Sequence, residues 1–206
     1  KKLKVPGLYV TTNGVETSRH LTRLKKIGIS GVNLSLDTLD PKRFLALTRR
    51  DRLADVLKTL ETCLELAIPL KINSVIVEDT TDRDIEHLVS LVKKNAISLR
   101  FIEQMGFSGS RTRKNNEENV LLSRLQKLFP GMREIVSENT STAKEFELAG
   151  FAGRIGIIEG HSRNFCSTCN KVRITPQGML KACLYDNGIL DLRVLLRSGA
   201  SDDNIS

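Results

Sequence analysis

Hydrophobic residues in the first half of the chain follow two alternating patterns. Short apolar runs with β-branched residues are typical of strands, and between them apolar residues recur every three or four positions, as in helices. The predicted strands cover Leu8–Thr12, Gly31–Asp37, Leu70–Val77 and Ser98–Met105. Strands that alternate with helices in this way predict a parallel sheet with helices packed outside it, either barrel-like or doubly wound.

Local signals mark the ends of several of these elements. The clearest helical pattern covers residues 51–67, and Cys63 lies on its apolar face, where we expect it to pack rather than to bind a metal. Asn13-Gly14 indicates a turn after the first strand. Residues 80–82 offer an N-cap for the helix that precedes the fourth strand.

The pattern changes after residue 105. Residues 106–119 are polar and rich in turn-forming residues, which predicts a long loop. A predicted helix from Val120 to Phe129 stops at Pro130-Gly131, and strand-like runs follow at residues 154–159 and 171–175. We therefore expect a small α+β module from about residue 141 to the end.

Charge and composition narrow the classes of ligand and binding partner that we expect. Lys and Arg number 32 against 24 Asp and Glu, and the net charge of +8 favours anionic ligands such as phosphates or nucleotides, although a solvated basic face explains it as well. Trp is absent and aromatic residues make up 4%, which argues against a surface that stacks nucleic-acid bases. There is no apolar run of the ~20 residues that a membrane span needs and no signal-peptide pattern at the start, so we expect a cytoplasmic protein.

Three of the four cysteines form the most specific local pattern. Cys166 and Cys169 are spaced as CxxC, and Cys183 follows after a predicted strand, turn and strand that can return it to the same point. Three thiolates suit an iron–sulfur cluster that keeps one iron open for a ligand. A structural zinc site with His161 as fourth ligand, or three unpaired thiols, remain alternatives.

Basic residues follow the CxxC pair directly. In the predicted strand at residues 171–175, Lys171 and Arg173 would project on one side, because side chains alternate along a strand. Two cations beside an open iron suit an anionic ligand such as a phosphate chain. Two exposed basic residues on an edge strand are the alternative.

Polar residues also occupy strand positions in the first half that apolar residues normally fill. The candidates are Thr11, Ser35, Lys71 and Arg100. Thr11 and Ser35 lie at the carboxyl ends of their strands, where parallel α/β barrels place their active sites. Lys71 and Arg100 lie nearer their strand starts, and if they face inward, an anionic ligand or an ion pair with Asp37 or Glu103 must offset their desolvation.

With these residues assembled, the chain is similar over nearly its whole length to the molybdenum cofactor biosynthesis protein A family. These proteins are GTP 3',8-cyclases of the radical S-adenosylmethionine superfamily. The resemblance rests on Thr11-Thr12-Asn13-Gly14, Asn33-Leu34-Ser35-Leu36-Asp37, Lys71-Ile72-Asn73, Arg100-Phe101-Ile102-Glu103, Phe165–Asn170 and Gly178–Leu184. The last two motifs at this spacing are the specific ones.

The resemblance implies an α/β fold in three parts. Residues 1–110 would be a partial TIM-type radical SAM barrel, residues 111–140 a loop and connecting helix, and residues 141–206 a small α+β module with a 4Fe–4S cluster and GTP-binding residues. Cys166, Cys169 and Cys183 would ligate that cluster, whose open iron would meet the guanine of GTP.

The resemblance also implies binding residues. Those expected to hold GTP are Thr11, Lys71, Arg100, Lys171, Val172 and Arg173. Ser35 and the backbone at Met105 would contact S-adenosylmethionine. The family has arginine where Lys171 stands, which keeps the charge but not bidentate phosphate recognition.

The implied reaction is the first step of molybdenum cofactor biosynthesis, in which GTP becomes 3',8-cyclo-7,8-dihydro-GTP by a radical route. The implied partners are GTP, S-adenosylmethionine, an electron donor and the next enzyme of the pterin pathway, with a homodimer as a further expectation and with no nucleic acid or membrane. A second 4Fe–4S cluster requires a CxxxCxxC loop, yet no cysteine precedes Cys63. We therefore expect a fragment without turnover of its own.

Two other functions remain open from the sequence. One is a radical SAM enzyme with an auxiliary cluster and a peptide substrate, against which the net charge and the pair Lys171 and Arg173 argue. The other is a zinc-binding module without catalysis.

Overall fold

The computed structural model describes residues 6–104, 120–135, 143–159, 171–183 and 186–201. The chain folds into two compact units. The larger, which we call the sheet unit, comprises Lys1–Met105 and Arg113–Arg163, and the smaller, which we call the hairpin unit, comprises Gly106–Thr112 and Asn164–Ser206.

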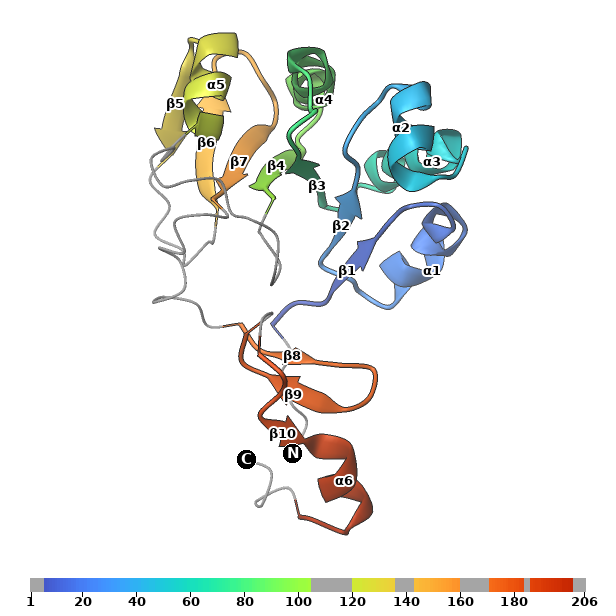
Figure 1. Cartoon of the computed structure of the whole chain (residues 1–206). Helices are drawn as coiled ribbons and strands as arrows, with labels where there is room; N and C mark the ends of the chain where they lie inside the picture. The colour runs from blue at the N-terminus through green and yellow to red at the C-terminus, as the bar shows by residue number, and fades with distance from the viewer. Residues whose placement is uncertain (1–5, 105–119, 136–142, 160–170, 184–185, 202–206) are drawn as a thin grey trace. The chain divides into compact units, whose positions relative to one another are not determined.

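A seven-stranded sheet organises the sheet unit (Figure 1). Its strands are β1 (Tyr9–Thr12), β2 (Gly31–Ser35), β3 (Leu70–Ile76), β4 (Ser98–Glu103), β5 (Met132–Ile135), β6 (Lys144–Leu148) and β7 (Arg154–Ile158). They pair in the order β1-β2-β3-β4-β7-β6-β5. The first four strands and β7 are parallel, whereas β6 and β5 run antiparallel to their neighbours. The predicted α/β class with a mostly parallel sheet is confirmed.

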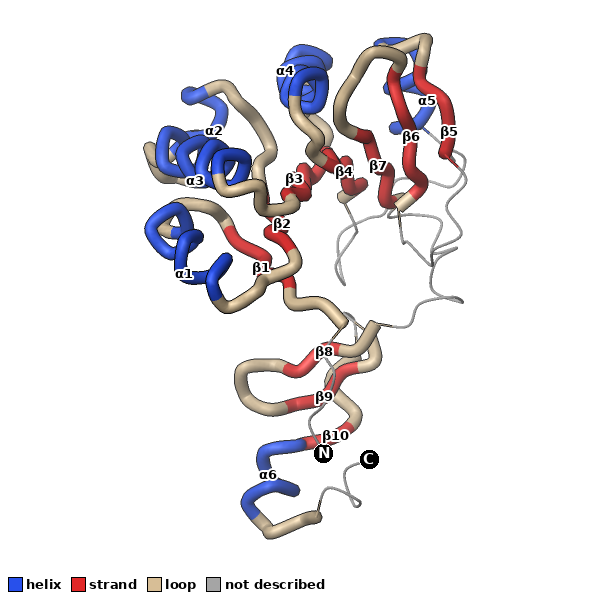
Figure 2. Tube along the Cα trace, turned by 180° about the vertical axis from the view of Figure 1, so that it is seen from behind, coloured by secondary structure: helices blue, strands red, loops and turns tan. Residues whose placement is uncertain are grey.

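The helices of the sheet unit lie outside the curved sheet in both views (Figures 1 and 2). They are the short 3-10 helix η1 (Thr17–His20), α1 (Leu21–Lys26), α2 (Pro41–Thr48), α3 (Leu53–Glu65), α4 (Asp82–Lys94) and α5 (Val120–Leu128). One hydrophobic core joins them to the sheet, and Val32, Leu99 and Phe101 from the strands are fully buried in it. Cys63 of α3 also lies in this core, which confirms that it packs.

Local sequence signals account for several element ends. Thr81 caps α4 in a capping box with Asp84, as the polar residues before that helix predicted. Asp40 caps α2 by accepting the Arg43 N–H, and Pro41 occupies the first turn, where its missing N–H costs nothing. The predicted turn after β1 contains Gly14 at φ 81°.

The sheet extends further along the chain than the predicted module boundary. Strands β6 and β7 lie after residue 141, yet β7 pairs in parallel with β4, and β6 pairs with β7. Gly153 makes the close approach before β7 possible, because a Cβ there would lie 2.3 Å from the Ile97 carbonyl oxygen. Residues 144–158 therefore belong to the sheet unit in this structure.

The hairpin unit is small, and its described residues form three short antiparallel strands and a helix. They are β8 (Arg173–Ile174), β9 (Met179–Lys181), β10 (Leu190–Asp191) and α6 (Leu192–Arg197). Gly178 at φ 90° lies in the turn before β9, which is the turn that the sequence predicted between the two strands ahead of Cys183. The described residues include no helix with the length and apolar character needed to cross a membrane.

Candidate functional site

Two rows of polar residues cross the parallel strands of the sheet unit. The strand register aligns Thr11, Asn33, Lys71 and Ser98 in one row and Ser35, Asn73, Arg100 and Gly156 in the other. Successive side chains in a strand point to opposite faces, and residues two apart share a face. Both rows therefore lie on the face opposite the helix-covered residues such as Val32 and Leu99, and we call this the polar face.

The first row is held by contacts within the sheet. The Asn33 side-chain amide donates to Thr11 Oγ1 at 3.2 Å. The Lys71 ammonium lies 5.2 Å from the centre of the Tyr9 ring, a distance at which cation and ring attract. Gly31 leaves room for that ring, since a Cβ at Gly31 would lie 3.1 Å from it.

The second row contains polar atoms that are buried and unpaired. Arg100 lies across Gly156, where a Cβ would be 3.2 Å from the Arg100 Cγ. Within the described part of the chain, the Arg100 Nε and the Asn73 Oδ1 are buried and have no hydrogen-bond partner. The guanidinium is a cation whose N–H groups only donate hydrogen bonds, so an anionic oxygen is a suitable partner for the Arg100 Nε.

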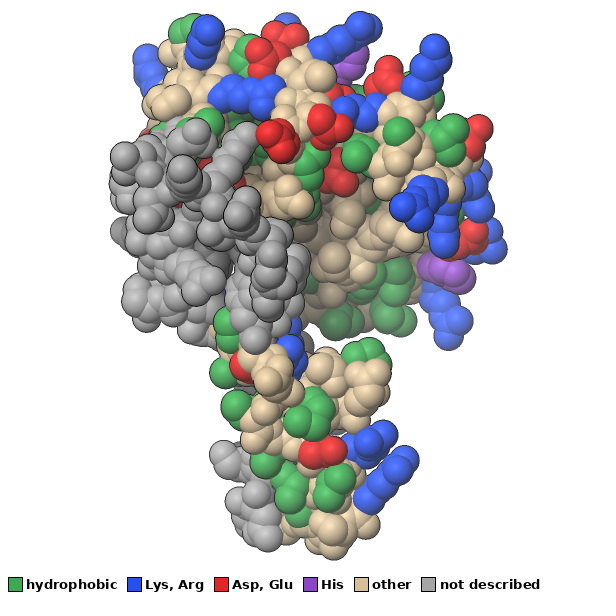
Figure 3. All heavy atoms as spheres, in the orientation of Figure 1, with side chains coloured by type: hydrophobic (Ala, Val, Ile, Leu, Met, Phe, Trp, Pro, Cys, Tyr) green, Lys and Arg blue, Asp and Glu red, His purple; other side chains and the backbone are tan. Residues whose placement is uncertain are grey.

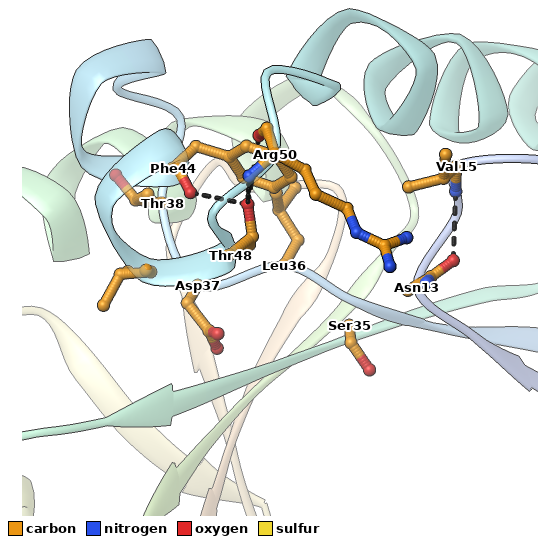
Figure 4. A pocket seen from close by; sticks show the side chains of 10 residues that line it. Asn13, Val15, Ser35, Leu36, Asp37, Thr38, Phe44, Thr48 and Arg50 are labelled. Carbon is orange, nitrogen blue, oxygen red and sulfur yellow. Dashed lines mark hydrogen bonds between the residues drawn. The ribbon is translucent and has the colours of Figure 1, made fainter.

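A cavity of about 350 Å³ lies at the carboxyl ends of β1 and β2 (Figure 4). In Figure 4 the Arg50 side chain extends toward Asn13 and Val15, and Ser35 and Asp37 follow one another along the opposite side. The lining residues are Asn13, Val15, Ser35, Leu36, Asp37, Thr38, Phe44, Leu47, Thr48 and Arg50. This location agrees with the rule that parallel strands present their functional residues at their carboxyl ends.

Two carboxylates fix the segment after β2. Asp37 Oδ1 accepts the Val75 N–H at 2.8 Å, and burial raises the pKa of Asp37 although that hydrogen bond and Arg43 oppose the rise. The next residue, Thr38, is buried and donates from its hydroxyl to Asp84 Oδ1 at 2.7 Å. The wall of the cavity at β2 is thus tied to β3 and to the start of α4.

In the hairpin unit, Cys183 is exposed and lies just after β9. Its backbone N–H donates to Asp186 Oδ2 at 2.6 Å, and the Gly188 N–H donates to Asp186 Oδ1 at 2.8 Å. Desolvation acts to raise the pKa of Asp186, but these N–H groups and Lys181 together hold it below its usual value. The ionised carboxylate therefore holds the backbone N–H groups of Cys183 and Gly188.

The structure brings some predicted site residues together and leaves others separate. Thr11, Ser35, Lys71 and Arg100 share the polar face of the sheet unit. Lys171, Val172 and Arg173 are exposed in the hairpin unit. Met105, Cys166, Cys169 and His161 lie outside the described residues, so the proposed cluster ligands are not tested, and the described residues alone contain no group of three metal ligands.

The predicted strand at residues 171–175 is shorter than expected. Strand β8 covers only Arg173–Ile174, so alternation along a strand does not extend to Lys171 and gives no reason to place it beside Arg173. Asn33, Asn73 and Arg50 also lie at this site, and the sequence patterns predicted no role for them. Both asparagines could have been found from the sequence, because each is a polar residue inside a strand. Arg50 could not, because it reaches the cavity only through the turn after α2.

Basic and acidic side chains are interspersed over the helix-bearing surface of the sheet unit (Figure 3). Examples are the ion pairs of Arg43 with Asp79, of Arg52 with Asp55 and of Arg124 with Asp82. Much of the positive charge on this surface is thus balanced by neighbouring carboxylates. Lys71 and Arg100 on the polar face are therefore the more informative cations for the question of which ligand binds.

Two family models match the chain, one in each half. The family model described as Molybdenum Cofactor Synthesis C matches residues 97–206, and that of the Radical SAM superfamily matches residues 1–92. The two matches together cover the strands that carry the polar face and the whole hairpin unit.

Relatives with curated names are similar over nearly the whole chain. The chain is 37% identical to molybdenum cofactor biosynthesis protein 1 of Mus musculus over 98% of its own length and 32% of the relative. It is 37% identical to the mitochondrial GTP 3',8-cyclase of Arabidopsis thaliana, covering 96% of the chain and 51% of the relative. It is 35% identical to GTP 3',8-cyclase of Clostridium perfringens strain SM101, covering 98% and 63%.

The chain thus spans between about a third and two thirds of the length of these curated relatives. The match to the Molybdenum Cofactor Synthesis C model covers more than half of the chain, and the Radical SAM match covers most of the rest. The chain therefore belongs to the molybdenum cofactor synthesis family of the radical SAM superfamily.

Proposed function

We propose that this chain is part of a GTP 3',8-cyclase, which converts GTP to 3',8-cyclo-7,8-dihydro-GTP in the first step of molybdenum cofactor biosynthesis. The observation that supports this most directly is the polar face, where Lys71 and Arg100 project from adjacent parallel strands in a chain of this family. Two cations that share one sheet face can bind a phosphate chain, and a triphosphate offers several anionic oxygens to both.

The sheet unit would supply distinct contacts to the two substrates. Thr11, Lys71 and Arg100 would bind GTP, and the exposed segment from Lys171 to Arg173 would add further contacts from the hairpin unit. Ser35, at the carboxyl end of β2 and in the wall of the cavity, would contact S-adenosylmethionine, together with the backbone at Met105. The cavity volume of about 350 Å³ is within the range of small-molecule sites.

The chemistry of the thiols fits an iron–sulfur cluster. Cys183 is exposed, and Cys166 and Cys169 would complete a three-cysteine ligand set with it. When bound, the clusters and S-adenosylmethionine supply the radical that removes hydrogen from C3' of GTP. The residues of this chain bind and orient the substrates.

The parallel strands with helices on one face also support a barrel of which residues 1–110 form a part. An electron donor, the next enzyme of the pterin pathway, a homodimer and a cytoplasmic location belong to the same proposal. Because the family's other cluster needs cysteines that residues 1–206 do not contain, we propose that these residues alone bind GTP without turnover.

Anaerobic reconstitution with iron and sulfide tests this function. The 206-residue chain should acquire the visible absorbance of an iron–sulfur cluster, contain iron rather than zinc, and bind GTP without forming product. The intact protein should form 3',8-cyclo-7,8-dihydro-GTP from GTP and S-adenosylmethionine. A colourless protein that retains zinc, or an iron-loaded intact protein that does not bind GTP, would contradict the proposal.

A further inference from the structure

Three buried side-chain atoms in the sheet unit lack a hydrogen-bond partner among the described residues. They are Asn73 Oδ1, Ser74 Oγ and Arg100 Nε. Buried polar atoms are nearly always paired, so each unpaired atom requires an explanation. Ser74 follows Asn73 in β3, so it faces the helices, where it is 0% exposed and beyond the reach of a ligand.

Asn73 and Arg100 differ from Ser74 in position. They are register partners in the parallel pair of β3 and β4, and both lie on the polar face. On one side of Asn73 the register places Ser35, and beyond Arg100 it places Gly156, which has no side chain. The absence of a side chain at Gly156 lets the Arg100 side chain lie across it, beside Ala143. Asn73 lies between Ser35 and Arg100, two residues already proposed to bind substrates.

The two unpaired atoms have complementary chemistry but do not bind one another. Asn73 Oδ1 accepts a hydrogen bond and Arg100 Nε donates one, and both stay unpaired although their residues are neighbours across the strands. A ligand that satisfies both must bring a hydroxyl or N–H donor beside an anionic oxygen. A ribose hydroxyl near a phosphate or carboxylate group meets this requirement.

We propose that Asn73 is a further substrate-binding residue, which accepts a hydrogen bond from a ribose hydroxyl while Arg100 Nε binds the anionic group of the same nucleoside ligand. This inference rests on the proposed function, because it assumes that the polar face holds a nucleoside. Both GTP and S-adenosylmethionine carry a ribose and an anionic group. The experiment therefore has to show which of these two ligands Asn73 binds.

The test measures the affinity of the intact, reconstituted protein for GTP, S-adenosylmethionine and inorganic triphosphate by calorimetry. Asn73→Ala should weaken binding of one nucleoside ligand by about three- to tenfold, the loss expected for one hydrogen bond. It should leave the affinity for inorganic triphosphate unchanged, because that ion has no ribose. Asn73→Asp, which is nearly the same size, should weaken binding further, because the new carboxylate would pair with Arg100 and repel the ligand's anion.

Ser74→Ala is the matched control. It removes the third unpaired buried atom from the neighbouring position of the same strand, on the helix-covered face, and should leave all three affinities unchanged. Thermal unfolding of each variant shows whether the fold is kept, and the near-isosteric Asn73→Asp preserves the test if Asn73→Ala does not fold.

The outcomes separate this inference from the proposed function. If the wild-type protein forms the cyclic product and Asn73→Ala and Asn73→Asp bind both nucleosides normally, the inference is wrong and the proposed function stands. An equal loss in Ser74→Ala would show a structural effect and would also overturn it. If the wild-type protein binds neither GTP nor S-adenosylmethionine, both fail.

Discussion

Among single residues, Asp84 links the segment after β2 to the start of α4. Its carboxylate accepts hydrogen bonds from Thr38 Oγ1 at 2.7 Å and from the Thr81 N–H at 3.0 Å, and it lies 3.3 Å from Arg43 Nε. Burial opposes ionisation, but the hydrogen bonds and Arg43 together hold the pKa of Asp84 below its usual value. The ionised form is therefore the one that stabilises the fold.

Replacement of Asp84 by Asn should lower the free energy of unfolding at pH 7 by about 3 kcal/mol, as expected when one member of a buried charged pair is removed. Because the folded pKa is depressed, the wild-type advantage should be complete above the unfolded value of about 4 and should vanish as pH falls through the lower folded value. Denaturant unfolding over a pH series measures this. The control is Asp79→Asn, whose exposed pair with Arg43 should contribute less than about 1 kcal/mol.

Asp37 should show the opposite dependence on pH. Since burial raises its folded pKa, its ionisation costs stability as pH rises from its unfolded pKa to its folded pKa. Asp37→Asn keeps an oxygen to accept the Val75 N–H and should be more stable than wild type at neutral pH, with no advantage in acid. The same unfolding series compares the two proteins, and an advantage that is equal at every pH would contradict this assignment.

Among the secondary-structure elements, two glycines with positive φ show which turns depend on packing. Gly14 follows β1 at φ 81°, and Gly28 follows α1 at φ 84°. A Cβ at Gly14 would lie 2.6 Å from Leu34 Cδ1 and 3.1 Å from Val56, whereas one at Gly28 would meet nothing within 4 Å. Both positions need a left-handed backbone, but only Gly14 packs closely against core side chains.

Gly28→Ala should therefore lower stability only through the left-handed backbone, by about 1 kcal/mol. Gly14→Ala should cost about 1–3 kcal/mol more, because the added methyl group overpacks the core against Leu34. Thermal or denaturant unfolding of the two variants gives the difference directly. Equal losses would mean that Leu34 moves aside without cost.

For the whole molecule, the proposed metal site and the fold should be separable. Cys183 is exposed in the hairpin unit, and Cys63 is buried in the core of the sheet unit, where desolvation raises the pKa of its thiol to about 11. A thiol that stays protonated is a poor metal ligand. The two residues are therefore matched for a test of which cysteine binds iron.

Cys183→Ser should abolish the iron–sulfur absorbance of the reconstituted chain and most of its bound iron, with little change in the unfolding of the sheet unit. Cys63→Ala should keep the iron content but lower stability by about 1–2 kcal/mol, because it leaves a small cavity in the core. Iron analysis and thermal unfolding of both variants distinguish them. Retention of iron by Cys183→Ser would contradict the three-cysteine ligand set.

The sequence by itself determined the elements that depend on neighbouring residues. Alternation of strand and helix patterns predicted β1–β4 and the helices between them, the polar residues before α4 predicted its cap, and Asn13-Gly14 predicted a turn. The spacing of Cys166, Cys169 and Cys183 and the polar strand residues gave the candidate chemistry. These signals are local, because capping, turn conformation and side-chain periodicity act over a few residues.

Only the tertiary structure decided which distant segments pair and in what register. It placed β7 beside β4, although the sequence predicted a separate module from residue 141. The same register aligned Ser35, Asn73 and Arg100 in one row, where two of their polar atoms have no hydrogen-bond partner among the described residues. Strand pairing depends on hydrogen bonds and packing between residues far apart in the chain, and no local pattern encodes which of several apolar strands will meet.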